Sequence, residues 1–252
     1  MLRFDLLQGL GTIDTSAQLY SRGFHDDRHA RTHRAALEIL GFLHRLVEFE
    51  SLCDFGCGVG SWLAAAEEIG ISDVRGYEGT WAREADMVVA PEIIDLRDLR
   101  QPIGTDRRFD LAMTLEVAEH LPEDRAATFV ADLCAHSDLV LFSAAIPMQG
   151  GVGHINERWP SYWAEFFSGN GYDPFDIVRP HFWNERHIPF WYRQNTLVYA
   201  KRGSEKVDLL AKADPASRSL LDLVHPEQYE FAEAAQPKRA IARKVRQALG
   251  RG

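Results

Sequence analysis

The amino-acid sequence predicts an α/β protein in which helices cover both faces of a mostly parallel sheet. Short apolar segments typical of strands alternate with helical patterns between residues 26 and 200. A glycine-rich turn joins the first strand to the helix after it. Hydrophobic residues make up 46% of the 252-residue chain and charged residues 26%, a composition that argues against wholesale disorder, a collagen-like fibre and a membrane protein.

The alternation begins with a helix at residues 26–47, where apolar side chains recur at helical spacing. A strand at residues 51–55 leads through the glycine turn to a helix at residues 61–69. Further strands are expected at residues 73–77, 109–115, 138–143, 172–178 and 196–200, with helices after residue 77 and at residues 123–136 and 160–168. We therefore expect a domain at residues 1–202 and a helical, basic tail at residues 203–252.

Charge and cysteine content restrict the environment and the partners. The chain has 28 basic and 37 acidic residues, a net charge of −9 that disfavours broad nucleic-acid binding. Three cysteines suggest no disulfide framework, so we expect a reducing, cytoplasmic location. The first residues do not fit a signal peptide, and no apolar stretch approaches the roughly 20 residues of a membrane span. The basic residues after position 237 favour a solvated helix over a partner, membrane-surface or polyanion contact.

The glycine turn reads DFGCGVG at residues 54–60 and is followed by Ser61. Glycines allow a sharp turn and a close approach of the backbone to a ligand. The dinucleotide-binding fingerprint would require glycine at position 61, which argues against an NAD-dependent oxidoreductase. Glu78 closes the next strand, where a carboxylate can accept hydrogen bonds from ribose hydroxyls.

These features resemble the class I S-adenosylmethionine-dependent methyltransferases over about residues 20–200. The resemblance implies a Rossmann-like fold with a mostly parallel seven-stranded sheet and S-adenosylmethionine as cofactor. Residues 98–99 resemble the segment that flanks the adenine, and residues 109–117 resemble the fourth-strand motif beside the methionine moiety. The cofactor-binding positions that the resemblance implies are Asp54, Gly56, Gly58, Gly60, Glu78, Asp98, Leu99 and Leu115.

A second group of chemically active residues follows the next two strands. Glu116, Glu119 and His120 come after the strand at residues 109–115, and His154 follows the strand at residues 138–143. If residues 116–120 form a helical turn, the two glutamates share a face. Parallel strands end at the same edge of a sheet, so His154 can approach this turn. Carboxylates and imidazoles in such a set can hold Mg²⁺, Mn²⁺ or Zn²⁺.

The pattern Glu-x-x-Glu-His with a distant His resembles small-RNA 3′-terminal 2′-O-methyltransferases and ubiquinone-pathway O-methyltransferases. The resemblance implies that Glu116, Glu119, His120 and His154 bind a divalent metal, which grips adjacent oxygens of the acceptor. If no metal binds, His154 or His120 is the best general base. The expected catalytic residues are therefore His154, His120 and Glu119.

Twelve of the 27 aromatic residues lie between Trp159 and Tyr192. Some must belong to the core, and core packing is the favoured role for any single one. Those with loop-like neighbours, such as residues 182–183 and 190–192, can alternatively stack on a sugar or an aromatic acceptor. Residues 150–195 and the HPEQY segment at residues 225–229 resemble a bacterial methyltransferase subgroup found with sugar- and polysaccharide-modifying enzymes. Residues 193–195 add polar groups suited to hydroxyls or carboxylates.

The sequence therefore favours methyl transfer to a hydroxyl of a saccharide or a similar polyhydroxylated small molecule. Methylation of nitrogen or carbon in a small molecule is the alternative that requires no metal. RNA 2′-O-methylation is opposed by the net charge of −9. A non-catalytic scaffold is opposed by the clustered glutamates and histidines, which a scaffold does not need.

Overall fold

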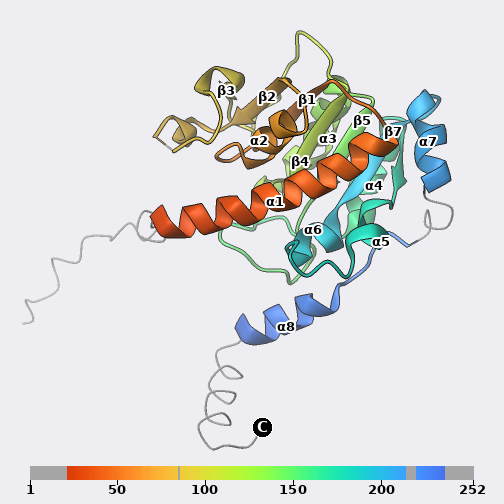
Figure 1. Cartoon of the computed structure of the whole chain (residues 1–252). Coiled ribbons are helices and arrows are strands. Elements are labelled where there is room, and N and C mark those ends of the chain that lie inside the picture. Colours follow the sequence, from red (N-terminus) through yellow and green to blue (C-terminus); the bar gives the residue numbers. More distant parts are fainter. Residues whose placement is uncertain (1–21, 85, 214–219, 236–252) are drawn as a thin grey trace, which may run out of the picture.

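The computed structural model describes residues 22–84, 86–213 and 220–235, which form a seven-stranded sheet between helices (Figure 1). The strands run in the order β3-β2-β1-β4-β5-β7-β6. Their bounds are β1 Ser51–Phe55, β2 Asp73–Glu78, β3 Ile94–Leu96, β4 Leu111–Leu115, β5 Leu139–Ser143, β6 Tyr172–Phe175 and β7 Leu197–Lys201. The expected Rossmann-like sheet is thereby confirmed.

The helices bury their apolar sides in two clusters, one on each face of the sheet. One cluster is built from α1, α2, α5, α6 and α7, and the other mainly from α3 and α4. The bounds are α1 Arg22–Leu46, α2 Ser61–Glu68, α3 Ala126–His136, α4 Pro160–Gly169, α5 Val178–Phe182, α6 Phe190–Asn195, α7 Glu205–Ala213 and α8 Pro226–Ala235. Short 3₁₀ turns lie at Thr80–Glu84, Pro91–Ile93, Ala118–His120 and Glu123–Arg125.

Strand directions determine where a ligand can approach. The five strands from β3 to β5 pair in parallel, whereas β7 runs antiparallel to both β5 and β6. The carboxyl ends of β1, β2, β4 and β5 consequently meet along one edge. In an open α/β sheet this edge is where ligands bind.

Several expected elements are wrong in detail. The strand expected at residues 172–178 ends at Phe175, and α5 begins at Val178. Its Pro174 is compatible with β6 because β6 is an edge strand. The aromatic segment at residues 190–192, expected in a loop, lies in α6, where core packing buries Phe190 and Tyr192. After β2 the chain forms only short 3₁₀ turns and then β3, a strand missing from the prediction. The basic segment after residue 237 lies outside the described residues.

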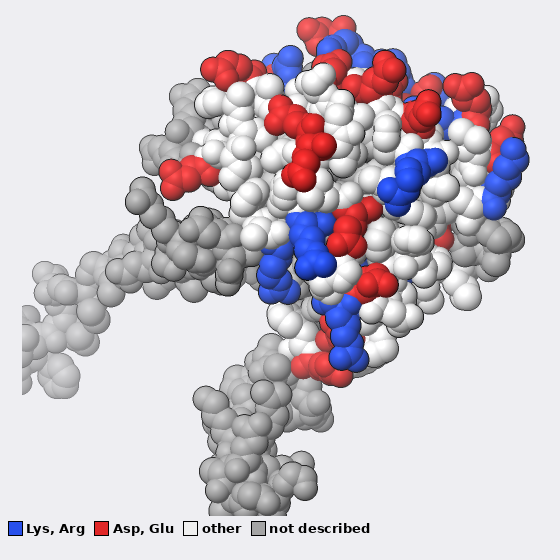
Figure 2. Space-filling view, in the orientation of Figure 1, with Lys and Arg blue, Asp and Glu red and all other residues white. Residues whose placement is uncertain are grey.

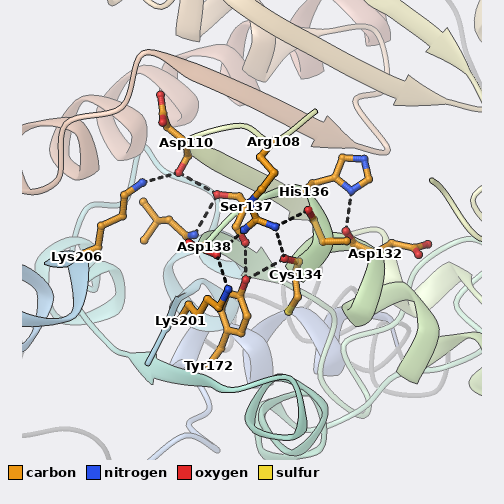
Figure 3. A network of polar contacts seen from close by, with 12 residues as sticks. Arg108, Asp110, Asp132, Cys134, His136, Ser137, Asp138, Tyr172, Lys201 and Lys206 are labelled. Carbon is orange, nitrogen blue, oxygen red and sulfur yellow. Dashed lines mark hydrogen bonds and ion pairs between the residues drawn. The ribbon is translucent and has the colours of Figure 1, made fainter. Parts of the chain in front are cut away.

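At the opposite ends of the strands, the segments just before β4 and β5 are joined by a network of polar contacts (Figure 3). The carbonyl oxygen of Asp110 accepts hydrogen bonds from Ser137 Oγ at 2.9 Å and Lys206 Nζ at 2.8 Å. The Tyr172 hydroxyl donates to the carbonyl oxygen of Ser137 at 2.6 Å. These bonds connect α7 and β6 to the chain just before β4 and β5, so this network serves to hold the sheet together.

Acidic and basic side chains are intermixed on the face of the molecule seen in Figure 2. In the described part of the chain, no helix has both the length and the apolarity that a membrane crossing demands.

Candidate functional site

The glycine turn at the end of β1 combines two packed glycines with one open position. Gly56, Gly58 and Gly60 have φ angles of 81°, 59° and 93°, which favour glycine. A Cβ atom on Gly56 or Gly60 would lie 2.5 Å from the side chain of Val117 or Val89, respectively. A Cβ atom on Gly58 would meet no protein atom within 4 Å. Gly56 and Gly60 therefore allow close packing, while Gly58 borders open space at the ligand-binding edge.

Glu78 is buried at the end of β2 and faces this turn. Its Oε2 accepts a hydrogen bond from the Gly58 N–H at 2.7 Å. Its Oε1 accepts bonds from the Gly79 N–H at 2.7 Å and from Trp81 Nε1 at 3.1 Å. Burial raises the pKa of Glu78, and these donors oppose the rise. Trp81, absent from the predicted site, could have been found as the aromatic residue three positions after Glu78, in the turn that follows β2.

The other expected cofactor positions have different surroundings. Asp54 is buried at the end of β1, and burial raises its pKa well above the usual range, with a further rise from the nearby glutamate of β2. Leu115 and Leu99 are also buried. The carboxylate of Asp98 is held by Arg100 at 2.9 Å, and these hydrogen bonds lower the pKa of Asp98.

The carboxyl ends of β4 and β5 bring together Glu119, His120 and His154. Each offers a ligand atom, and the three atoms lie within 4.8 Å of one another. Glu119 is fully buried, and neither carboxylate oxygen has a hydrogen-bond partner in the described structure. Burial raises the pKa of Glu119 well above its usual range, and the charge of Glu116 raises it further. The nearby backbone N–H groups of Glu119 and Ala145 oppose the rise, although neither reaches hydrogen-bond geometry. Because an unpaired buried carboxylate is costly, the site suits a cation or a hydrogen-bond donor.

Both histidines are oriented by acceptors on their Nδ1 atoms. His154 Nδ1 lies 2.9 Å from Glu157 Oε1, and because a carboxylate only accepts hydrogen bonds, Nδ1 carries the proton. His154 Nε2 then faces Glu119 Oε1 at 3.9 Å with its lone pair. His120 Nδ1 similarly donates to the carbonyl oxygen of Gly153 at 3.2 Å. A carboxylate behind an imidazole is a common arrangement at metal sites and beside catalytic bases.

The loop after β5 holds His154 close to the turn after β4. The backbone N–H groups of Ile155 and Asn156 donate to the carbonyl oxygen of Glu119 at 2.9 and 3.0 Å. A Cβ atom on Gly151 would lie 2.2 Å from His154 Nε2. The imidazole therefore occupies space that is free only because residue 151 is glycine.

Glu116 departs from the geometry that the sequence spacing suggested. Its φ angle is +58°, and the 3₁₀ turn begins only at Ala118, so Glu116 and Glu119 do not share a helical turn. Glu116 Oε1 accepts a hydrogen bond from Asn195 Nδ2 at 3.0 Å, and Oε2 accepts one from Gln149 Nε2 at 2.7 Å. Burial raises the pKa of Glu116, and the two amide donors oppose the rise. Glu116 thus lies outside the group of three, with its carboxylate held by amides.

These amides connect the site to the C-terminal segment. Gln194 Nε2 donates to Asn195 Oδ1 at 3.0 Å, and Gln194 Oε1 accepts from the backbone N–H of His225 at 2.8 Å. Gln228 Nε2 donates to the carbonyl oxygen of Met148 at 2.8 Å. Residues 193–195, predicted to offer polar groups to hydroxyls or carboxylates, are buried. They bind Glu116 and the HPEQY segment. The HPEQY segment in turn contacts the loop after β5 through Gln228.

Comparison with known proteins agrees with this architecture. The sequence profile of a family described as a methyltransferase domain matches residues 28–163. No curated protein sequence matches the chain significantly.

Solved structures of similar fold include CalS10, an amino pentose methyltransferase from Micromonospora echinaspora, at 13% identity and a TM-score of 0.53, over 72% of this chain and 98% of that one. The sugar N-methyltransferase KedS8 from a Streptoalloteichus species has 14% identity and a TM-score of 0.52, over 80% and 98% of the two chains. DesVI from Streptomyces venezuelae has 14% identity and a TM-score of 0.51, over 77% and 100%. At such identities the likeness concerns the fold.

Proposed function

The chain belongs to the family of methyltransferase domains, and on this premise we propose that it methylates a hydroxyl of a saccharide or similar polyhydroxylated small molecule, with S-adenosylmethionine as methyl donor. The observation that carries the choice of a hydroxyl is the fully buried Glu119 carboxylate, which has no hydrogen-bond partner in the described structure, beside His120 and His154. Such a group can bind acceptor oxygens through a divalent cation or receive their protons.

The glycine turn and Glu78 support the choice of cofactor. S-adenosylmethionine, when bound, supplies a methyl group activated by its sulfonium. The open space at Gly58 suits a ligand lying against the backbone. Glu78 is oriented by Gly58, Gly79 and Trp81, so its carboxylate is prepared for ribose hydroxyls. Fixed orientation is central here because methyl transfer needs in-line positioning more than covalent help.

The acceptor side fits a divalent metal held by Glu119, His120 and His154. Such an ion, when bound, lowers the pKa of an acceptor hydroxyl. The chain contributes a buried carboxylate without a hydrogen-bond donor, and two imidazoles that are oriented by the contacts of their Nδ1 atoms with Glu157 and the Gly153 carbonyl oxygen. Glu116 is a neighbouring negative charge with amide partners. Each of its oxygens accepts one amide hydrogen bond and has a second lone pair.

Without a metal, the same residues can act as a general base. His154 Nε2 can accept the hydroxyl proton while Glu157 stabilises the imidazolium through Nδ1. A saccharide acceptor is favoured by the resemblance of residues 150–195 and 225–229 to methyltransferases found with sugar-modifying enzymes.

A methyl-transfer assay with neutral sugars, amino sugars and catechols, each with and without EDTA, tests this proposal. We expect methyl ethers of a sugar and loss of turnover with EDTA, restored by excess Mg²⁺ or Mn²⁺. Turnover that resists EDTA but fails in His154→Ala would indicate the metal-free base. Methylation restricted to amines or catechols would overturn the proposal of a sugar hydroxyl.

A further inference from the structure

A cavity of about 390 Å³ is lined in part by Glu157, which contacts His154 of the cluster formed by Glu119, His120 and His154. The cavity is lined by Pro147, Glu157, Arg158, Trp159, Ser161, Tyr162 and Glu165. Its volume is within the range of small-ligand pockets. Glu157 joins the two sites, because it lines the cavity while its Oε1 accepts the hydrogen bond from His154 Nδ1.

The aromatic side chains of the cavity suit a sugar ring. Trp159 precedes α4 and is 40% exposed, although most large aromatic residues of this segment are buried. Tyr162 lies in the first turn of α4, and the guanidinium carbon of Arg158 lies 5.2 Å from its ring centroid. An exposed indole presents a flat, weakly polar surface on which the C–H face of a pyranose can stack.

The charges of the cavity restrict which sugar it accepts. Arg158 is already paired with Glu123 at 2.6 Å. Glu157 receives hydrogen bonds from His154 and from the N–H groups of Met148 and Gly150. The exposed carboxylate of Glu165 has no ion pair within the described residues. Because carboxylates accept hydrogen bonds and repel anions, the lining favours hydroxyl or ammonium groups over sugar acids.

From these contacts we propose that the cavity is a subsite for a second sugar unit of the acceptor, one that is neutral or carries an amino group. A unit whose hydroxyl lies at His154 has Glu157 at its side, and the next unit then rests on Trp159. The inference rests on the proposed function and adds that the acceptor is at least a disaccharide. Trp159 and Glu165 are its specificity-determining residues.

Binding can be measured separately from methyl transfer by saturation-transfer difference NMR with S-adenosylhomocysteine present. The probes are methyl glycosides of neutral, amino and uronic-acid disaccharides, each paired with its monosaccharide. We expect at least one neutral or amino disaccharide to bind at least fivefold more tightly than its monosaccharide, and the acidic disaccharides to bind weakly. Trp159→Ala should remove this advantage and Trp159→Phe should retain most of it. Glu165→Gln should reduce the discrimination against acids.

Tyr229→Ala is the matched control, since Tyr229 is 68% exposed and does not line the cavity. The proposal is overturned if no neutral or amino disaccharide exceeds its monosaccharide, or if Trp159→Ala binds as the wild type does. Disaccharide binding that depends on Trp159, without methylation of any sugar, would retain the subsite and reject the proposed function. Methylation of a monosaccharide, with no gain in binding from a second sugar unit, would retain the proposed function and reject the subsite.

Discussion

Asn195 Nδ2 donates a hydrogen bond of 3.0 Å to Glu116 Oε1, joining the end of α6 to the residue that follows β4. Asn195 Nδ2 also lies 2.9 Å from Gln149 Oε1. The buried amide of Asn195 thus orients both the Glu116 carboxylate and Gln149, which donates to the other oxygen of Glu116. The bond offsets part of the cost of desolvating the Glu116 carboxylate, which is half-buried.

Asn195→Ala should destabilise the protein, because it removes the donor to Glu116 Oε1 and leaves buried polar atoms unpaired. A loss of about 1–3 kcal/mol in the free energy of unfolding is expected, measured by urea denaturation. Asn184→Ala, at an exposed position, is the control and should change stability little. Equal stabilities for the two variants would contradict the role of this hydrogen bond.

Gly58→Val should abolish binding of S-adenosylhomocysteine in calorimetry, because the new side chain fills space that the protein leaves open. The positive φ angle of Gly58 adds strain to any substitution, so a control must share it. Gly70→Val provides one, since Gly70 also has a positive φ angle and open surroundings but lies at the end of α2. Near-normal affinity in a folded Gly58→Val protein would contradict the assignment of the glycine turn to the cofactor site.

Glu78→Ala should weaken S-adenosylhomocysteine binding while the protein stays folded. Loss of a charged hydrogen-bonding group costs about 1.5–3 kcal/mol, which corresponds to roughly 10- to 150-fold in the dissociation constant. Glu92→Ala, on the exposed turn before β3, should bind normally. An unchanged dissociation constant in Glu78→Ala would show that this carboxylate does not contact the cofactor.

Mn²⁺ titrated into the protein should bind at one site in calorimetry, and Glu119→Gln should lose that binding. Gly151→Ala should also weaken it, because the added methyl group displaces the imidazole of His154. Both variants should retain S-adenosylhomocysteine binding, which uses other residues. Glu48→Gln, at an exposed position, is the control for loss of a carboxylate. Absence of Mn²⁺ binding to the wild type would rule out this metal site.

His136 should make the stability of the protein depend on pH. Burial lowers the pKa of His136 in the folded protein, so the unfolded chain binds the proton more readily. The contribution of neutral His136 to the free energy of unfolding is therefore fully present above the unfolded pKa of about 6.5. It is lost as the pH falls through the lower pKa of the folded protein. His136→Phe should flatten this decline in urea denaturation between pH 7.5 and 5.5, whereas Asn184→Ala, at an exposed position without a titratable group, should leave it unchanged. Parallel declines in the wild type and His136→Phe would contradict the assignment.

The sequence alone determined the central strands of the sheet and the glycine turn, because both depend on local patterns. Apolar strands such as residues 51–55 and 139–143 are recognisable from their neighbours. Glu78 and the residues 54–60 could be placed at one edge because parallel strands end together. The sequence also indicated that His154 would approach Glu119 and His120, and the three are grouped in the structure.

Only the tertiary structure decided which side chains pair with which. Spacing placed Glu116 and Glu119 on one helical face, but the positive φ angle of Glu116 turns its carboxylate toward Asn195 and Gln149. The residues that make this environment are far apart in the sequence, and their choice of partner depends on burial and on competing hydrogen bonds. Local periodicity contains no information about such long-range contacts, so the amide network and the cavity beside Trp159 emerged only when the chain was folded.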